Sequence, residues 1–240
     1  MPEYFDMHCH ILFGVDDGPE RMEDALALLQ LEYDSGVRTI YLTPHYRRSM
    51  FECPPDVRMR NYELLKEWAG QHLPDLTLNL GCELYVNMDV VQELKDGECF
   101  TLGNTDFVLL EFPVTAEKSY LVERCHAVMN SGYTPVIAHA ERCASVRKDL
   151  ELLQRLVDMG VYIQMNAGSI IGENGLAWKW FCKKAMRRGL LHFVGSDTHD
   201  LKKHRPNLEK CARYLEKVMG ADYRDQIMIR NPRELIEGSV

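Results

Sequence analysis

The 240-residue sequence has no apolar run that approaches the roughly 20 residues of a membrane-spanning helix. Its first residues lack a basic region followed by an apolar core, so they do not resemble a signal peptide. Lys and Arg number 28 against 36 Asp and Glu, and the resulting net charge of −8 disfavours binding to nucleic acid. Low-complexity segments and flexible linkers are also absent. We therefore expect one folded domain, residues 1–240, in the cytoplasm, with no nucleic-acid partner and no membrane insertion.

The eight cysteines form no C-x-x-C pair and stand singly along the chain. Disulfide frameworks belong to short secreted chains, so we expect reduced thiols, most of them in the core as small apolar residues. Cys182 and Arg188 have the C-x5-R spacing of cysteine-based phosphatases, but no glycine lies between them. Because the surrounding residues predict an amphipathic helix, we interpret Cys182 as a core residue and not as a nucleophile.

Strands and helices alternate along the chain. At four joints an amphipathic helix ends at a glycine and a strand-like run follows: Gly36, Gly132, Gly160 and Gly189. The expected strands are short and largely apolar, at about 3–7, 37–43, 76–83, 106–111, 134–138, 161–165 and 191–195. Helices are expected at about 22–33, 56–69, 88–96, 117–130, 148–158, 174–187 and 207–219. Alternating strands and helices indicate a parallel α/β sheet, which is either open and doubly wound or closed into a barrel.

Side chains that can bind metal stand at the carboxyl ends of six of the seven predicted strands. His8 and His10 end the first strand two residues apart, so both rings point to the same side. The other candidates follow later strands or, for Asp17, the turn behind the first strand: Asp17, His45, Glu83, Glu111, His139, Asp197 and His199. The strand ends of a parallel barrel meet on one face, where such folds keep their active sites. We therefore predict a metal centre built from these nine residues.

The predicted ligands are imidazoles and carboxylates without a thiolate, which favours Mn, Fe or Zn over a structural, cysteine-bound zinc. Nine ligands are too many for one ion and suffice for two or three, with Glu83 placed to bridge. The charge of three divalent ions would exceed that of four carboxylates and one hydroxide. A locally positive site on an acidic protein favours an anionic substrate.

The motifs resemble those of the PHP (polymerase and histidinol phosphatase) superfamily. The matching segments are Met7-His8-Cys9-His10, Thr43-Pro44-His45, Gly81-Cys82-Glu83, Glu111, His139-Ala140-Glu141-Arg142 and Ser196-Asp197-Thr198-His199. More narrowly, the segment from His8 to Pro19 is similar to the start of the manganese-dependent protein tyrosine phosphatases of bacterial capsule synthesis. The segment from Met50 to Pro54 also resembles a loop of that group, and the resemblance extends from residue 6 to about residue 205.

This resemblance implies a distorted (β/α)7 barrel of TIM type, the PHP fold, with three divalent ions, manganese first and iron or zinc as alternatives. By motif, the first ion would take His8, His10, Glu83 and Asp197, the second Glu83, Glu111 and His139, and the third Asp17, His45 and His199. The implied substrate is a tyrosine-phosphorylated protein, a bacterial tyrosine kinase that controls polysaccharide export. The oligomeric state is not indicated.

The leading functional prediction is hydrolysis of a phosphate monoester by metal-activated hydroxide, because a metal lowers the pKa of bound water from 15.7 to about 7. Arg142 and Arg205 offer bidentate donors to phosphate oxygens, and we place them with Asp197 and His199 among the catalytic residues. Arg47 and Arg48, after His45, are predicted to contact substrate at the entrance. Two alternatives stay open: a small-molecule phosphatase such as histidinol phosphatase, and a non-catalytic module that docks phosphotyrosine.

Overall fold

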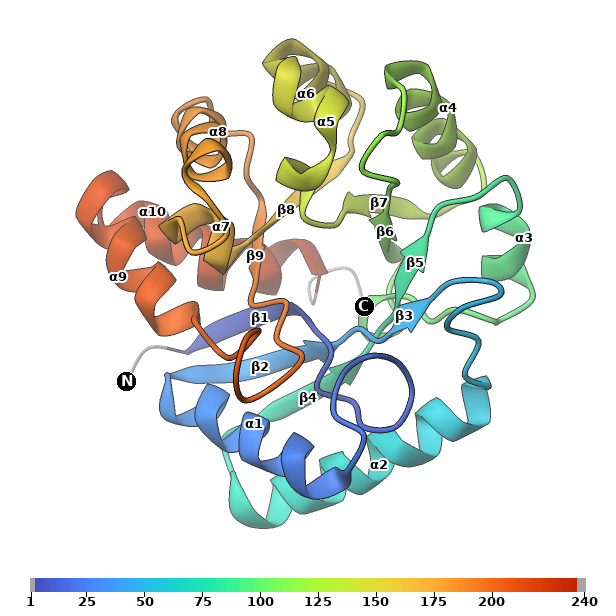
Figure 1. The fold of residues 1–240 in the computed structure, drawn as a ribbon, viewed down its shortest axis with the longest axis vertical. Coiled ribbons are helices and arrows are strands. Elements are labelled where there is room, and N and C mark those ends of the chain that lie inside the picture. The colour runs from blue at the N-terminus through green and yellow to red at the C-terminus, as the bar shows by residue number, and fades with distance from the viewer. Residues whose placement is uncertain (1–2, 237–240) are drawn as a thin grey trace.

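The computed structural model describes residues 3–236, which form a curled parallel α/β barrel (Figure 1). The strands are β1 (Tyr4–Cys9), β2 (Val37–Leu42), β3 (His45–Tyr46), β4 (Thr77–Leu80), β5 (Glu83–Tyr85), β6 (Phe107–Glu111), β7 (Thr134–Ile137), β8 (Tyr162–Asn166) and β9 (Phe193–Gly195). They form a three-stranded sheet in the order β1-β2-β4 and a six-stranded sheet in the order β3-β5-β6-β7-β8-β9. All named strand pairs are parallel. The predicted TIM-like α/β fold is confirmed.

At two of the predicted strands the chain breaks and a second short strand follows. The predicted strand 37–43 ends as β2, and β3 resumes three residues later in the other sheet. The predicted strand 76–83 is likewise divided into β4 and β5. The first break includes Pro44, which has no N–H to donate to a strand ladder. Eight of the nine strands overlap the seven predicted ranges, β3 lies beyond the predicted range 37–43, and the breaks let β3 and β5 join the six-stranded sheet.

The first and last strands meet beside the strand ends. The backbone N–H of Asp197 donates to the His8 carbonyl at 2.8 Å, and the N–H of His10 donates to the Thr198 carbonyl at 2.8 Å. A Cβ atom added to Gly195 would lie 2.4 Å from the Cβ of His8. Only glycine permits this close approach of β9 to β1. The segment of His8 and His10 and the segment of Asp197 and His199 are thereby held together by main-chain contacts.

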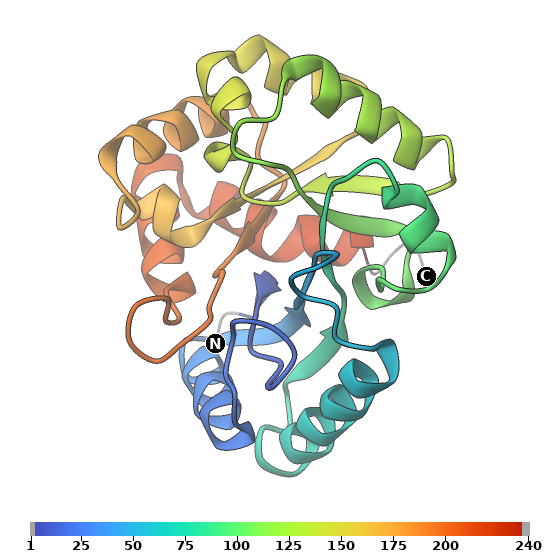
Figure 2. The same cartoon turned by 45° about the vertical axis from the view of Figure 1, so that its right-hand side comes forward.

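The apolar strands are buried on both faces, as their composition predicts. On β6, Phe107 and Leu109 belong to an inner cluster with residues of β1, β2, β7 and β9, whereas Val108 and Leu110 belong to the main outer core. Successive side chains of a strand point to opposite faces, so this division follows the alternation of the strand. The outer face packs against the helical layer, which surrounds the sheet in both views (Figures 1 and 2).

The principal helices are α1 (Met22–Asp34), α2 (Pro55–His72), α3 (Val90–Lys95), α4 (Lys118–Met129), α6 (Leu150–Asp158), α8 (Leu176–Arg187) and α9 (Leu208–Met219). Three short helices were not predicted: α5 (Ala144–Lys148), α7 (Ala167–Ile171) and α10 (Ala221–Asp225). The predicted helix 148–158 is interrupted because Asp149 is extended and its carboxylate accepts hydrogen bonds from the N–H groups of Glu151 and Leu152, capping α6. None of the helices in the described range is long and apolar enough to cross a membrane.

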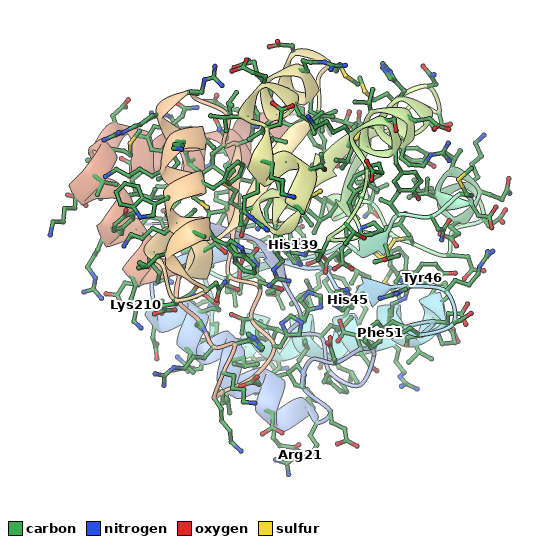
Figure 3. The ribbon with its side chains drawn as sticks, turned by 45° about the horizontal axis from the view of Figure 1, so that its top comes forward. Arg21, His45, Tyr46, Phe51, His139 and Lys210 are labelled. Carbon is green, nitrogen blue, oxygen red and sulfur yellow. A yellow bond between two sulfur atoms is a disulfide. The ribbon has the colours of Figure 1, made fainter. Side chains whose placement is uncertain are left out.

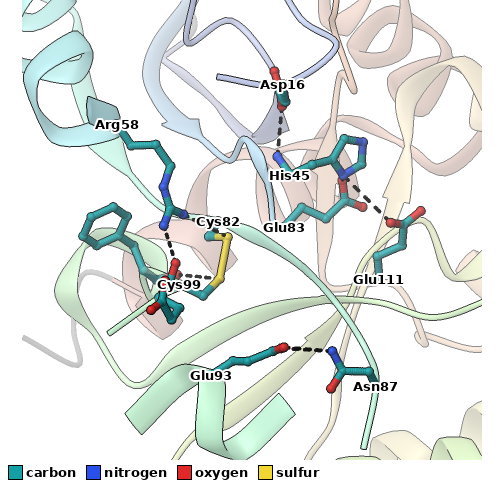
Figure 4. Close-up of a disulfide and its surroundings, with 11 residues drawn as sticks. Asp16, His45, Arg58, Cys82, Glu83, Asn87, Glu93, Cys99 and Glu111 are labelled. Carbon is teal, nitrogen blue, oxygen red and sulfur yellow. Dashed lines mark hydrogen bonds and ion pairs between the residues drawn. A yellow bond between two sulfur atoms is a disulfide. The ribbon is translucent and has the colours of Figure 1, made fainter. Parts of the chain in front are cut away.

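One expectation from the cysteines is wrong. Cys82 and Cys99 form a disulfide, with Cα atoms 5.8 Å apart, whereas the other six cysteines are free. Cys82 lies at the break between β4 and β5, and the chain beyond α3 returns Cys99 to the same place (Figure 4). Neither cysteine belongs to a spacing motif, so their proximity depends on the tertiary path of the chain and could not be read from the sequence.

Candidate metal centre

The nine predicted ligands lie together, and two of them, His45 and Glu83, begin the short strands β3 and β5 just beyond the ends of β2 and β4. On β6, Glu111 follows the inward-facing Phe107 and Leu109 at a spacing of two, so the strand itself directs its carboxylate to the inside of the barrel. His45 reaches the site from β3 and His139 from the end of β7, and Figure 3 shows both in the central part of the molecule. The fold thus assembles side chains from strands far apart in sequence.

His139 and Asp197 have left-handed backbone conformations, with φ angles of 30° and 56°. Ala138 faces the inner cluster, so a regular strand would direct the next side chain outward. The left-handed turn instead brings the Nε2 atom of His139 to within 2.7 Å of the Oε1 atom of Glu83. Such conformations cost about 1–3 kcal/mol and cluster at functional sites, where the surrounding structure holds them.

Glu83 lies at the centre of the cluster and is completely buried. Its Oε2 atom is 3.1 Å from His8 Nε2, 3.2 Å from His10 Nε2 and 3.0 Å from His45 Nδ1. Its Oε1 atom contacts the fourth imidazole, that of His139. Despite these short distances, Oε2 has no hydrogen bond of acceptable geometry among the described residues. A buried carboxylate oxygen surrounded by imidazole nitrogens without a hydrogen bond fits a shared metal ligand.

The candidate donor atoms form four overlapping groups, each spanning less than 4.8 Å: His10, Asp17, His45 and His199; His8, His10 and Asp197; His8, Glu83 and His139; and His45, Glu83 and Glu111. The first group contains the whole set that the motifs imply for the third ion, together with His10. His139 and Glu111, implied to share one ion, fall into different groups, although His139 Nε2 is only 3.9 Å from Glu111 Oε1. The structure thus brings together all nine residues, and the division among ions stays a prediction.

Three polar residues that the sequence did not single out orient these side chains. Asp16 Oδ2 lies 2.7 Å from His10 Nδ1 and also accepts the backbone N–H of His45. Gln164 Oε1 lies 3.2 Å from His8 Nδ1, and Asn166 Nδ2 donates to Asp197 Oδ2 at 2.6 Å. Such outer contacts fix ring orientation and tautomer in metal sites. The alternation of polar and apolar residues in β8 was a signal that could have identified Gln164 and Asn166.

Asp6, in β1, connects the first strand of the barrel to the segment that follows the last strand, β9. Its carboxylate accepts hydrogen bonds from the backbone N–H of His8 at 3.2 Å and the backbone N–H of Ser196 at 2.9 Å. It also accepts a hydrogen bond from the Ser196 hydroxyl at 2.6 Å. Asp6 is fully buried, so these contacts are not exposed to competition from water. One carboxylate thus fixes the segment of His8 relative to the segment of Asp197.

The electrostatics of the cluster reflect its mixed charges. Burial by itself raises the pKa of Glu83, but His8, His45 and His139 outweigh it and hold the pKa well below its ordinary value. Burial lowers the pKa of His8 and His45, yet the Glu83 carboxylate reverses the effect and raises these pKa values to about 9 and about 10. The imidazoles of His8 and His45 therefore hold protons at neutral pH, and a metal ion that binds these rings displaces those protons.

Arg142 and Arg205 lie on the Asp197 side of the centre. The Arg142 guanidinium donates to Asp197 Oδ2. Burial by itself lowers the pKa of Arg142, but the Asp197 carboxylate and other nearby carboxylates outweigh burial and raise this pKa above its ordinary value. Arg142, Asp197 and Arg205 line one cavity of about 270 Å³. Both predicted phosphate donors therefore border the same space, and Arg142 contacts a candidate ligand directly.

Arg47 and Arg48 have other partners. The guanidinium of Arg47 stacks 4.0 Å above the centroid of the Tyr85 ring. Arg48 pairs with Asp89 at 3.0 Å and with Glu93 at 3.3 Å. The charge of Arg48 is therefore already balanced by two carboxylates, which leaves Arg47 as the better supported of the two predicted substrate contacts.

Cys182 lies inside α8 and is fully buried, as the helical interpretation predicts. Burial raises the pKa of its thiol far above the ordinary value, which keeps it protonated. We therefore expect Cys182→Ser to retain kcat within about twofold in folded protein, since a nucleophilic thiolate is not available there. Phosphate release by the metal-loaded variant measures this, and a loss of about three decades of kcat would restore the cysteine mechanism.

Comparison with known proteins places this arrangement in a family. The family model described as capsular polysaccharide synthesis, CpsB/CapC, matches residues 4–237. The chain belongs to the CpsB/CapC family. The tyrosine-protein phosphatase CpsB of Streptococcus agalactiae serotype III is 34% identical over 237 residues, covering 97% of this chain and 98% of that protein. The tyrosine-protein phosphatase YwqE of Bacillus subtilis is 32% identical over 218 residues, covering 90% of this chain and 85% of that protein.

Solved structures agree with the family assignment. A structure from work on YwqE of Bacillus subtilis and CpsB of Streptococcus pneumoniae, described as unique metal-dependent tyrosine phosphatases, superposes with a TM-score of 0.90 at 29% identity. It covers 98% of this chain and 95% of that one. Histidinol phosphate phosphatase of Lactococcus lactis superposes with a TM-score of 0.60 at 13% identity over 90% of this chain and 94% of that one, which shows a common fold. Members of the CpsB/CapC family thus share the architecture throughout this chain.

Proposed function

We propose that this chain hydrolyses phosphotyrosine in proteins with divalent ions held by His8, His10, Asp17, His45, Glu83, Glu111, His139, Asp197 and His199. The chain is a metal-dependent tyrosine-protein phosphatase of capsule synthesis, in keeping with its family and its relatives. The observation that carries the site assignment is Glu83, a buried carboxylate with four imidazoles at 2.7–3.2 Å and one oxygen without a hydrogen bond. That donor set fits Mn, Fe or Zn.

Divalent ions in such a site polarise phosphate oxygens and lower the pKa of water, which supplies a nucleophile at neutral pH. The protein's own contribution is orientation and charge. Glu83, whose pKa is held low by the surrounding imidazoles, supplies an ionised carboxylate at the centre of the site, whereas Asp16 and Gln164 hold the rings of His10 and His8 in fixed directions. We propose three ions, manganese first, because nine donors converge there.

The arginines complete the phosphate site in this proposal. Arg142 presents a planar fork beside Asp197, and phosphate oxygens that approach from the cavity can accept two parallel hydrogen bonds from it. Arg205 lines the same cavity and adds a second cation. Asp197, which lines this cavity, and His199, which lines a second hollow, are the candidates for proton transfer to the phenolic leaving group, which has a pKa of about 10.

The substrate that we propose is a phosphorylated tyrosine kinase that controls polysaccharide export, acted on in the cytoplasm. Membership of a capsule-synthesis family and relatives named as tyrosine-protein phosphatases support this substrate. Histidinol phosphate, the competing small substrate, is supported only by a common fold at 13% identity. A docking module without catalysis is disfavoured because no member of the nine-residue donor set is missing.

Metal removal tests the proposal. Chelation followed by desalting is expected to abolish phosphate release from a phosphotyrosine peptide, and Mn²⁺ is expected to restore it, because the predicted nucleophile depends on the ions. Phosphate release from histidinol phosphate, measured in parallel, distinguishes a tyrosine phosphatase from a small-molecule phosphatase. Binding of the peptide without phosphate release would identify a docking module. Full activity in a preparation that elemental analysis shows to be free of metal would disprove the mechanism.

A further inference from the structure

The segment between β9 and α9 carries cations that have no acidic partner. Lys202, Lys203 and Arg205 form no ion pair among the residues that the structure describes, unlike Lys210 nearby, which lies 3.0 Å from Glu173. The whole chain has a net charge of −8, so these three positive side chains within four residues form a local positive charge on an acidic protein. Adjacent like charges repel, and an anionic ligand between them would relieve this repulsion.

These cations border the candidate catalytic site. Lys202, Lys203 and Arg205 line the cavity of about 270 Å³ that also contains Arg142 and Asp197. Lys202 and Lys203 additionally line a second hollow whose wall includes Asp17 and His199. Lys202 and Lys203 therefore line two hollows that both include candidate metal ligands, Asp197 in one and Asp17 with His199 in the other.

The backbone of this segment is held in a defined turn. Asp200 Oδ1 accepts hydrogen bonds from the N–H groups of Lys202 at 2.5 Å and Lys203 at 2.6 Å. The N–H of His199 donates to the His204 carbonyl at 2.8 Å, which closes the turn onto a candidate metal ligand. The positions of the lysine Cα atoms are thereby fixed relative to the site, whereas their ammonium groups stay free to meet an anion.

We propose that Lys202 and Lys203 form a subsite for a carboxylate side chain that neighbours the phosphotyrosine in the protein substrate. The proposal rests on the proposed function. Arg142, which contacts Asp197, is the donor proposed for the phosphoryl group, whereas Lys202 and Lys203 line both this cavity and the hollow beside Asp17 and His199. A recessed cavity of this size accommodates one or two side chains and not the extended flat contact that a lipid surface makes.

Paired phosphopeptides test the subsite. Two phosphotyrosine peptides are identical except that Asp or Glu on both sides of the phosphotyrosine is replaced by Asn or Gln. The wild type is expected to prefer the acidic peptide in kcat/KM by about threefold to twentyfold at low salt, mainly through KM, and to lose this preference as salt is added. The double variant Lys202→Glu/Lys203→Glu is expected to abolish or reverse the ratio between the two peptides.

A matched control separates the subsite from the general charge of the protein. Lys184→Glu/Lys217→Glu makes the same change in net charge at exposed positions on α8 and α9, and it is expected to keep the wild-type ratio. Equal rates for both peptides with the wild type would overturn the subsite while leaving the phosphatase intact. A preserved preference in the Lys202/Lys203 variant, or an equal loss in the control, would overturn it too. Release of phosphate from neither peptide would instead disprove the proposed function.

Discussion

Glu83→Ala is expected to lose more bound metal than any change of a ligand at the edge of the cluster. Glu83 contacts four imidazoles and joins two of the four donor groups, so its removal weakens more than one ion position at once. Even residues that only support metal ligands cost about 10–100-fold in affinity or activity when replaced. We therefore expect kcat/KM to fall by more than about a hundredfold, together with a measurable loss of ions per chain by elemental analysis.

Glu111→Ala is the matched control for this experiment, because it removes the same chemical group from a residue that joins one donor group only. Glu83→Gln keeps the volume of the side chain and removes its charge, which separates loss of a ligand from creation of a cavity. Circular dichroism establishes that each variant is folded. A Glu83→Ala protein that retains as many ions as Glu111→Ala would mean that Glu83 does not bridge.

Arg142→Ala is expected to fold and bind metal normally but to lose kcat/KM by roughly tenfold to a thousandfold. This is the range for removing a charged clamp from developing phosphoryl charge. Arg142→Lys is expected to recover only part of the loss, because an ammonium group cannot form the two parallel hydrogen bonds of a guanidinium. Steady-state kinetics on a phosphotyrosine peptide and metal content, measured on the same preparations, give the answer.

The contact of Arg142 with Asp197 makes the metal measurement essential, since loss of the arginine also changes the surroundings of a candidate ligand. Arg155→Ala on the exposed side of α6 is the control for removal of one positive charge. Kinetic constants within twofold of the wild type would exclude Arg142 from the phosphate site. A fall in activity that follows a fall in metal content would assign it to support of Asp197 instead.

The gathering of the nine candidate ligands could be predicted because it depends on topology alone. His8 and Glu111 lie in the last residues of β1 and β6, and Glu83 lies just beyond the end of β4, so parallel strands bring all three to one face. The same rule could not predict the orientation of His139, since its strand alternation points outward and only the left-handed turn reverses it. Contacts between side chains, such as that of Asp16 with His10, depend on backbone and side-chain torsion angles, which the pattern of residue types in the sequence does not specify.

Ion pairs between residues far apart in the sequence could not be predicted. Arg142 and Asp197 are 55 positions apart, and nothing in their local sequence indicates that they meet. Arg48 was predicted at the entrance on its nearness to His45, but Asp89 and Glu93 come from a different loop and helix and neutralise it. The Cys82–Cys99 disulfide likewise depends on the three-dimensional path of the chain. That path determines which residues become neighbours, and the local sequence does not show it.

The contact between Asp6 and Ser196 has a consequence for the order in which the protein can mature. The two residues are 190 positions apart, so His8 and Asp197 cannot face each other until almost the entire chain has left the ribosome. Incomplete chains lack the closing segment and offer cellular metal only part of its coordination shell. Loading with metal is therefore tied to completion of folding, and captured ions in turn stabilise the closed barrel against reopening between its first and last strands.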